Sequence, residues 1–175
     1  SSGLSLLFRP TLRANSPLRA SAYNTLTTVD VSVLQEGMKY RKLPNSDLVI
    51  SELGLGTMNF GNKVSKSSCI ELLDLATKDY GINFIDTAEA YPAPFAQSTV
   101  GKSERIIGSW LKQHKSSATG ALKHTLSSSF RDSIVLSTNI CGYGPDITWC
   151  RKDGAPTQLT PNQIVEAVDG QLERL

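Results

Sequence analysis

Short apolar strand patterns alternate with helix patterns along most of this chain, and this alternation restricts the possible fold more than any other feature. The strand patterns cover residues 53–57, 82–85 and 134–136, and each is followed by a helical segment. Strands that alternate with helices form parallel sheets joined by right-handed crossovers. A doubly wound sheet and a (β/α)8 barrel both fit this order. The chain of 175 residues is too short for a complete barrel, which needs about 250 residues.

A predicted hairpin and a first helix have clear local signals. Residues 39–43 and 48–51 flank a run of turn-forming residues at 44–47, which predicts a short hairpin before the first strand. The first helix is expected to follow Ser65 and to end at Gly81. Its apolar residues recur at helical spacing and predict one buried stripe: Cys69, Leu72, Leu73 and Ala76.

Two further helices are predicted. One covers residues 101–114, and its apolar face consists of Ile107, Trp110 and Leu111. The last begins at Thr160, which can cap it, while Pro161 suits the first helical position and Gln163 can complete a capping box. The apolar face expected on this last helix consists of Ile164, Val165, Val168 and Leu172.

Two segments between these elements show no pattern. Residues 116–130 are rich in serine and are expected to form a loop. Residues 139–159 have neither a helical nor a strand period. This second segment, which includes Tyr143 and Trp149, is interpreted either as a binding loop or as a plain connector.

The N-terminal arm differs in composition from the rest of the chain. Residues 1–29 hold Arg9, Arg13 and Arg19 and several serines, but no Asp or Glu. This composition is typical of an organelle transit peptide, which predicts import into a plastid. A disordered tail on a cytoplasmic protein is the alternative. We therefore place residues 1–37 outside the fold and treat residues 38–175 as one domain.

The overall composition excludes several classes of protein. A hydrophobic content of 39% and a net charge of +2 suit an ordinary globular domain and argue against disorder. No apolar run approaches the roughly 18 residues of a membrane helix, and a pI near 8.4 falls short of a nucleic-acid-binding footprint. The cysteines at 69, 141 and 150 form no CxxC pair. They are predicted to be free thiols, and no metal site is expected.

Polar residues follow the predicted strands at the positions where barrel enzymes carry their chemistry. Thr57, Asp86 and Asn139 each stand at or just past the end of an expected strand. Tyr91 lies shortly after Asp86, and a carboxylate beside a phenol suggests proton transfer with the hydroxyl as general acid. Alternatively, Asp86 caps a turn and Tyr91 lines a surface loop. The Gly-rich segment 54–61 matches neither the dinucleotide-binding fingerprint nor a P-loop.

Several stretches resemble the aldo-keto reductase family. Residues 38–43 (MKYRKL) and 53–58 (LGLGTM) resemble its opening segments. Residues 81–91 (GINFIDTAEAY) are similar to the segment around its catalytic Asp and Tyr, and residues 101–108 (GKSERIIG) match the start of the following helix. The Pro-rich segment 91–94 is similar to the Tas-like branch of that family.

The resemblance implies an α/β fold that is part of a (β/α)8 TIM barrel, with an N-terminal hairpin and about three βα units. It also implies an NADP(H)-dependent oxidoreductase that reduces aldehydes or ketones to alcohols, with Tyr91 as the proton donor. Asp86 and Tyr91 match two of the four catalytic positions of the family. Gly56, Thr57 and Met58 match the segment near the nicotinamide. The implied partner is a small carbonyl substrate, with no nucleic acid and no membrane.

Two departures from the family pattern bear on activity. Asn139 stands where the resemblance implies a catalytic Lys, and the implied catalytic His belongs beyond Leu175. We therefore expect a truncated form with impaired activity. The alternative is a non-catalytic nucleotide-binding or regulatory protein on the same fold, because a fold does not determine a function.

Overall fold

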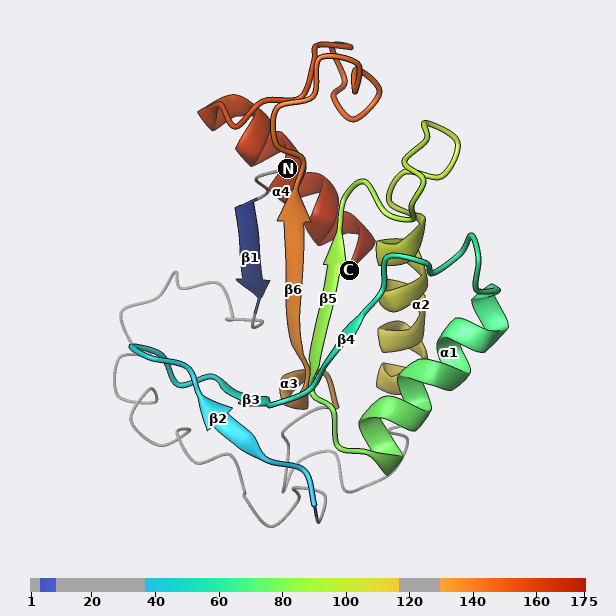
Figure 1. Cartoon of the computed structure of the whole chain (residues 1–175), viewed down its shortest axis with the longest axis vertical. Helices are drawn as coiled ribbons and strands as arrows, with labels where there is room; N and C mark the ends of the chain where they lie inside the picture. Colours follow the sequence, from blue (N-terminus) through green and yellow to red (C-terminus); the bar gives the residue numbers. More distant parts are fainter. Residues whose placement is uncertain (1–3, 9–36, 117–129) are drawn as a thin grey trace.

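In the computed structural model, a four-stranded sheet with the order β1-β6-β5-β4 lies at the centre of the molecule (Figure 1). Strands β4 (Gly54–Gly56), β5 (Phe84–Ala88) and β6 (Val135–Ile140) are parallel neighbours. The predicted parallel α/β arrangement is therefore confirmed, and the described strands form an open sheet rather than a closed barrel. The structure describes three stretches of the chain: residues 4–8, 37–116 and 130–175.

A helix follows each of the parallel strands. Helix α1 (Lys66–Asp74) continues into a wider π-helical turn, η4 (Leu75–Asp79), and follows β4. Helix α2 (Lys102–Ser116) follows β5, and α4 (Pro161–Arg174) follows β6. Helices α2 and α4 lie behind the sheet in the view of Figure 1, with α1 packed beside α2. A single turn, α3 (Phe130–Ser133), precedes β6 and is not anticipated by the sequence patterns.

The predicted start of α1 is confirmed, but its buried face is narrower than expected. The Ser65 hydroxyl caps the helix by accepting a hydrogen bond from the backbone N–H of Ser68, 3.2 Å away. Cys69 and Leu73 are fully buried, whereas Leu72 keeps 40% of its surface exposed. The prediction for Leu72 is therefore wrong. The physical reason is that α1 packs on α2, and Leu72 lies on the side of the stripe that stays open to solvent.

The hydrophobic core lies between the sheet and helices α1 and α2. Trp110 on α2 is fully buried, and its indole Nε1 donates to Asp74 Oδ1 on α1 at 2.7 Å. The expected burial of Ile107, Trp110 and Leu111 is confirmed. The core combines residues from all these elements: Phe60, Cys69, Leu73, Ile85, Ile106, Ile107, Trp110, Leu111, Ile134 and Leu136.

The predicted hairpin consists of β2 (Tyr40–Lys42) and β3 (Val49–Ser51), which pair antiparallel. It lies across the end of the sheet where β5 and β6 begin (Figure 1). Asn83 holds it there, because its side chain accepts from the Ser51 N–H at 2.7 Å and donates to the Val49 carbonyl at 2.9 Å. The hairpin therefore covers the amino ends of the strands and leaves the carboxyl ends open.

Strand β1 (Leu4–Phe8) pairs antiparallel with β6, with Leu4 opposite Ile140 and Phe8 opposite Leu136. The sequence patterns do not anticipate it, because residues 1–37 are expected to lie outside the fold. The backbone groups along the outer edge of β6 need hydrogen-bond partners, and an edge of this kind can accept a strand from elsewhere in a chain. Residues 9–36 lie outside the described stretches, as do residues 117–129 of the loop expected at 116–130. The ends of that loop are helical, because Ser116 belongs to α2 and Phe130 to α3.

Strands β5 and β6 run further than the apolar patterns at 82–85 and 134–136 indicate. Asp86 and Asn139 therefore lie within strands, not just after them as expected. Asp86 pairs with Ser137, and Ala88 pairs with Asn139. The ladder uses backbone atoms only, so it continues past the residues where side chains become polar.

Helix α4 departs from two expectations. The Thr160 hydroxyl caps it, but the Gln163 side chain does not complete the capping box. Gln163 Oε1 instead accepts from the backbone N–H of Gln158 at 2.6 Å, in the preceding loop. Val165 and Leu172 are each 60% exposed, while Gln171 is fully buried. The expected apolar face is wrong at these two residues, because α4 packs against β6 and α2 through a different side.

Candidate active site

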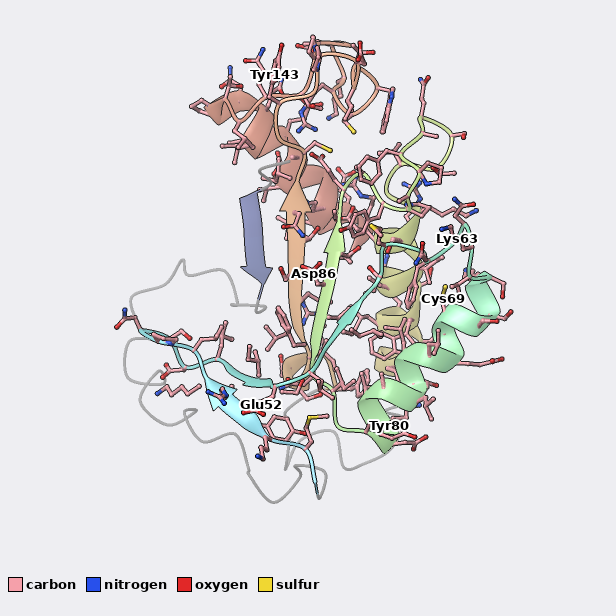
Figure 2. All side chains as sticks on the ribbon, in the orientation of Figure 1. Glu52, Lys63, Cys69, Tyr80, Asp86 and Tyr143 are labelled. Carbon is pink, nitrogen blue, oxygen red and sulfur yellow. The ribbon has the colours of Figure 1, made fainter. Side chains whose placement is uncertain are left out.

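The carboxyl ends of β4, β5 and β6 lie side by side and bring together residues that are distant in the sequence. The register places Gly56 opposite Asp86 and Ala88 opposite Asn139. Figure 2 shows Asp86 on the sheet, with Tyr143 beyond the carboxyl end of β6. Three of the predicted site residues, Gly56, Asp86 and Asn139, thus lie near one edge of the sheet, as expected for parallel strands.

Asn139 and Asp86 are in direct contact across the β5–β6 pair. The Asn139 side-chain nitrogen donates to the Thr87 carbonyl oxygen at 2.8 Å and to Asp86 Oδ1 at 3.3 Å. This amide carries a dipole but no charge. It orients the carboxylate without neutralising it, whereas an ammonium group would do both.

Tyr91 lies on the turn directly after β5. Its backbone N–H donates to the Ala88 carbonyl at 3.1 Å, and its ring stacks on Phe95 with centroids 6.1 Å apart and planes inclined by 20°. Burial of the hydroxyl and the nearby negative charge of Asp86 raise the pKa of Tyr91 above its ordinary value of 10.0. The phenol therefore keeps its proton at neutral pH and can only act as a donor there.

Thr57 faces the interior and holds Asp86 through the backbone. Its N–H and its hydroxyl both donate to the Asp86 carbonyl oxygen, at 3.0 and 2.9 Å. The Ser103 hydroxyl donates in turn to Thr57 Oγ1 at 2.8 Å, and Thr57 is fully buried. The hydrogen bonds of Thr57 therefore hold β5 against the end of β4. The Thr57 hydroxyl points away from solvent.

Gly56 and Met58, on either side of Thr57, are open to solvent. A Cβ placed on Gly56 would meet no atom within 4 Å. Met58 is 45% exposed, and its carbonyl accepts from the Ala93 N–H at 2.9 Å. This last contact ties the segment after β4 to the segment after Tyr91, so that the two form one border of the candidate site.

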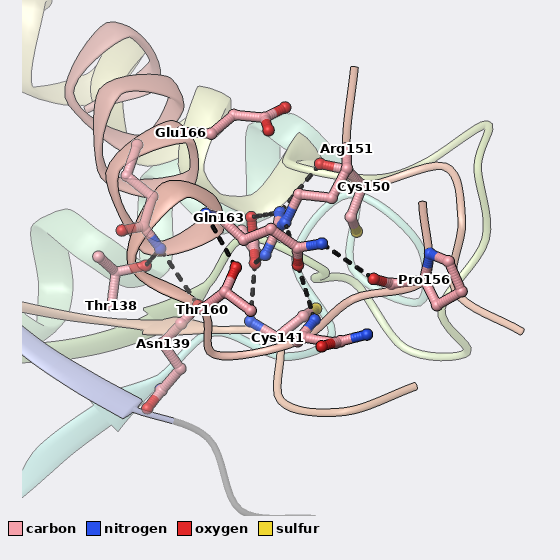
Figure 3. A network of polar contacts seen from close by, with 12 residues as sticks. Thr138, Asn139, Cys141, Cys150, Arg151, Pro156, Thr160, Gln163 and Glu166 are labelled. Atoms are coloured by element: carbon pink, nitrogen blue, oxygen red, sulfur yellow. Dashed lines mark hydrogen bonds and ion pairs between the residues drawn. The ribbon is translucent and has the colours of Figure 1, made fainter. Parts of the chain in front are cut away.

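The structure adds a buried ion pair that the sequence patterns do not identify. Arg151 Nη1 and Nη2 each lie 2.9 Å from one carboxylate oxygen of Glu89, and both residues are almost fully buried (Figure 3). The Glu89 carboxylate also accepts from the Cys141 backbone N–H at 2.7 Å. This ion pair links the turn after β5 to the loop after β6.

Glu89 carries a weak signal in the sequence, because it is an acidic residue closely following a buried strand in the family-like segment. Arg151 carries none, since it lies 62 residues away in a segment without pattern. That segment is a loop beyond Ile140, as predicted, with one isolated bridge between Gly144 and Thr157. Tyr143 on this loop is 75% exposed.

Two cavities of the described structure lie at the hairpin and not at the strand ends. One, of about 480 Å³, is lined by residues 42–47, and the other, of about 350 Å³, by Arg41, Ile50, Ser51 and Glu52. They stand at the amino end of the sheet, opposite the polar residues.

Within residues 4–8, 37–116 and 130–175, no three His, Cys, Asp or Glu side chains gather in a way that could hold a metal ion. None of the helices in these same stretches has the length and apolar character required to cross a bilayer.

The fold and the candidate site define the class of protein. Parallel strands alternate with helices, a hairpin covers the amino ends, and polar residues gather at the carboxyl ends, which is the arrangement of β/α-barrel enzymes. Residues 52–175 match the model of the aldo/keto reductase family, and the chain belongs to that family.

Individual relatives agree with this assignment. The chain is 36% identical over 139 residues to the protein Tas of Escherichia coli (strain K12), and equally to Tas of Shigella flexneri, covering 79% of this chain and 35% of each relative. Its structure is similar to that of an aldo-keto reductase from Bacillus halodurans in its holo form, with a TM-score of 0.51 and 27% identity over 79% of this chain and 36% of the other. The chain thus spans about a third of the length of the relatives it matches.

Proposed function

We propose that this chain carries part of the active site of an NADP(H)-dependent reductase that converts aldehydes or ketones to alcohols, with Tyr91 as proton donor. Family membership supports the reaction type. The observation that carries the residue assignment is the place of the half-buried Tyr91 on the turn directly after β5, the strand that holds Asp86.

The residues around Gly56 fit a flat ring at the cofactor position. No side chain blocks the space above Gly56, and Met58 offers an exposed apolar surface beside it. NADP(H), when bound, supplies the hydride, and the protein supplies orientation and the proton. We propose that Gly56 and Met58 border the nicotinamide, while Thr57 keeps the segment in place through its bonds to the Asp86 carbonyl oxygen.

We expect proton transfer from Tyr91 to be the slow step in this chain. The Tyr91 hydroxyl gives its proton to the carbonyl oxygen as the alcohol forms. A cation nearby would stabilise the phenolate that remains, but Asn139 is neutral. Burial and the charge of Asp86 raise the pKa of Tyr91 instead. General acid catalysis contributes about 10²–10⁴ in rate. We propose that a large part of this factor is missing, so that turnover by this chain is slow.

A non-catalytic nucleotide-binding or regulatory role is the second candidate. The observation in its favour is that the Asn139 amide is held by two protein acceptors, Thr87 O and Asp86 Oδ1, as a structural residue would be. On this alternative, the chain binds NADPH and turns over no carbonyl compound.

One assay distinguishes these functions. The purified chain is mixed with NADPH, binding is followed by nicotinamide fluorescence, and turnover of a reactive aldehyde is followed by nicotinamide absorbance. Slow turnover that Tyr91→Phe abolishes supports the reductase. Binding without turnover supports the regulatory role. Turnover that Tyr91→Phe leaves unchanged, or no NADPH binding at all, contradicts the proposal.

Import into a plastid stays a prediction from the composition of residues 1–29. The matched relatives named above are bacterial proteins and lend it no support. A small carbonyl compound is the proposed substrate, and neither a nucleic acid nor a membrane is proposed as a partner.

A further inference from the structure

Two half-buried thiols lie on the loop that follows β6. Cys141 is the first residue after the strand, Cys150 lies further along the same loop, and both are free cysteines. The third free cysteine, Cys69, is fully buried in α1, where its Sγ lies 3.6 Å from the Val64 carbonyl oxygen. Cys141 and Cys150 are thus open to small reagents in a way that Cys69 is not.

A single buried ion pair holds the backbones of both loop cysteines. The Cys141 N–H donates to Glu89 Oε1 at 2.7 Å, and the Cys150 carbonyl accepts from Arg151 Nη1 at 2.9 Å. Glu89 and Arg151 are themselves joined by two contacts of 2.9 Å. Figure 3 shows the two cysteines beside this pair. The same buried ion pair therefore binds the loop backbone at Cys141 and at Cys150.

The shared ion pair brings the two loop cysteines near one another. A hydrogen bond with the Cys150 thiol, followed by burial and by the charge of Cys150, raises the pKa of the Cys141 thiol above its ordinary value. The raised pKa disfavours the thiolate of Cys141, so of the two thiols Cys141 is the one expected to react second. The ion pair keeps them near each other through the backbone, so little chain entropy remains to be lost on joining them.

We propose that Cys141 and Cys150 form a redox modification site, in which a peroxide joins the two sulfurs in a disulfide that closes the loop 141–150. The Cys150 thiolate attacks an oxygen of hydrogen peroxide, the O–O bond breaks, and a sulfenic acid on Cys150 and water are formed after protonation. The second thiol displaces the hydroxyl group from that sulfur as a second water. Both sulfurs are oxidised, the peroxide is reduced, and a thiol reductant reverses the bond.

The disulfide site would lie close to the candidate active site. Cys141 follows Asn139 by two positions, with Ile140 between them. Closing the loop would restrict the segment that carries Tyr143 and Trp149. The proposal rests on the thiols and the ion pair alone and does not depend on the proposed function.

The test uses the whole chain, first reduced and then treated with a small excess of hydrogen peroxide. Free thiols, titrated after unfolding, are expected to fall from three to one. Trypsin releases residues 132–151 as one peptide that contains both loop cysteines, and this peptide should lose two hydrogens and resist alkylation. Cleavage before Asp146 should leave its halves joined until a reductant is added.

Matched variants identify the partners. Cys69→Ser should keep the two-hydrogen loss in residues 132–151, and Cys150→Ser should abolish it and leave Cys141 open to alkylation or further oxidation. The proposal is overturned if the wild-type peptide keeps two alkylated thiols after treatment. It is equally overturned if the disulfide joins Cys69 or links two chains.

Discussion

The side-chain nitrogen of Asn139 lies 2.8 Å from the carbonyl oxygen of Thr87 and 3.3 Å from Oδ1 of Asp86, so it joins the ends of β5 and β6. The family resemblance implies a lysine at this position. The contact shows that a residue at 139 reaches the Asp86 carboxylate, whose charge in turn acts on Tyr91. The charge at position 139 is therefore expected to control the acidity of the proposed proton donor.

Asn139→Lys should lower the pKa of Tyr91 from its present raised value, because an ammonium group beside Asp86 offsets the carboxylate charge. The phenol titration is followed by ultraviolet absorbance, with Tyr91→Phe identifying its part of the signal. If the chain turns over NADPH, the rate should rise by up to roughly 10²-fold, part of the range of general acid catalysis.

Asn139→Gln serves as the matched control, because it keeps a neutral amide. It should leave the pKa of Tyr91 near the wild-type value. An Asn139→Lys variant with an unchanged Tyr91 titration would show that position 139 does not act on the phenol.

Thr57→Val should destabilise the chain by about 1–3 kcal/mol, since it removes a buried hydroxyl that donates to the Asp86 carbonyl and accepts from Ser103. Urea unfolding followed by tryptophan fluorescence measures the change. Ser98→Ala, at an exposed position, should stay within about 0.5 kcal/mol of the wild type. Equal unfolding midpoints for both variants would contradict the role given to Thr57.

Arg151→Met should cost about 3–5 kcal/mol of unfolding free energy, because it leaves the Glu89 carboxylate buried without its cation. Adding Glu89→Gln to it should recover part of the loss. The exposed pair of Arg41 and Glu52 provides the control, since Arg41 keeps 76% of its side chain exposed and Arg41→Met should cost no more than about 1 kcal/mol. Similar losses for the two arginine variants would contradict the importance of burial.

Protonation of the buried Glu104 carboxyl group should make the free energy of unfolding depend on pH. It is fully buried, and burial raises its pKa above the ordinary 4.5, although Arg174 and the Thr138 hydroxyl oppose the shift. Because the folded chain holds this proton more tightly than the unfolded chain, the stabilisation is complete below about pH 4.5 and is lost as the pH rises through the raised value.

The measurement compares the unfolding free energy of the wild type with that of Glu104→Gln at several pH values from acid to neutral. The wild-type advantage over the variant should shrink as the pH increases. An advantage that grows with pH would mean that the pKa of Glu104 is lowered in the folded chain.

Much of the fold was predictable because its signals are local. The turn residues at 44–47 predict the hairpin, Ser65 and Thr160 mark the starts of α1 and α4, and the apolar spacing of α2 indicates its buried face. Each signal acts over a few residues along one segment of backbone, so it can be recognised without knowing what packs against it.

The candidate site was predictable only in part. Asp86, Tyr91 and Asn139 stand out through their places after apolar strands and through the family resemblance. Neither the contact of Asn139 with Asp86 nor the inward direction of Thr57 could be read from the sequence, because both depend on the register of neighbouring strands. A shift of register by one residue would turn these side chains to other faces.

The alternation of strands and helices, the helix starts and the family resemblance could be recognised from the amino-acid sequence, because each depends on residues that lie near one another along the chain. The tertiary structure alone decided that Arg151 meets Glu89 across 62 residues, that Val165 and Leu172 face solvent, and that β1 pairs with the edge of β6. The physical reason is that burial and pairing depend on which surfaces meet. That outcome is set by the packing of whole elements and not by the preferences of any one of them.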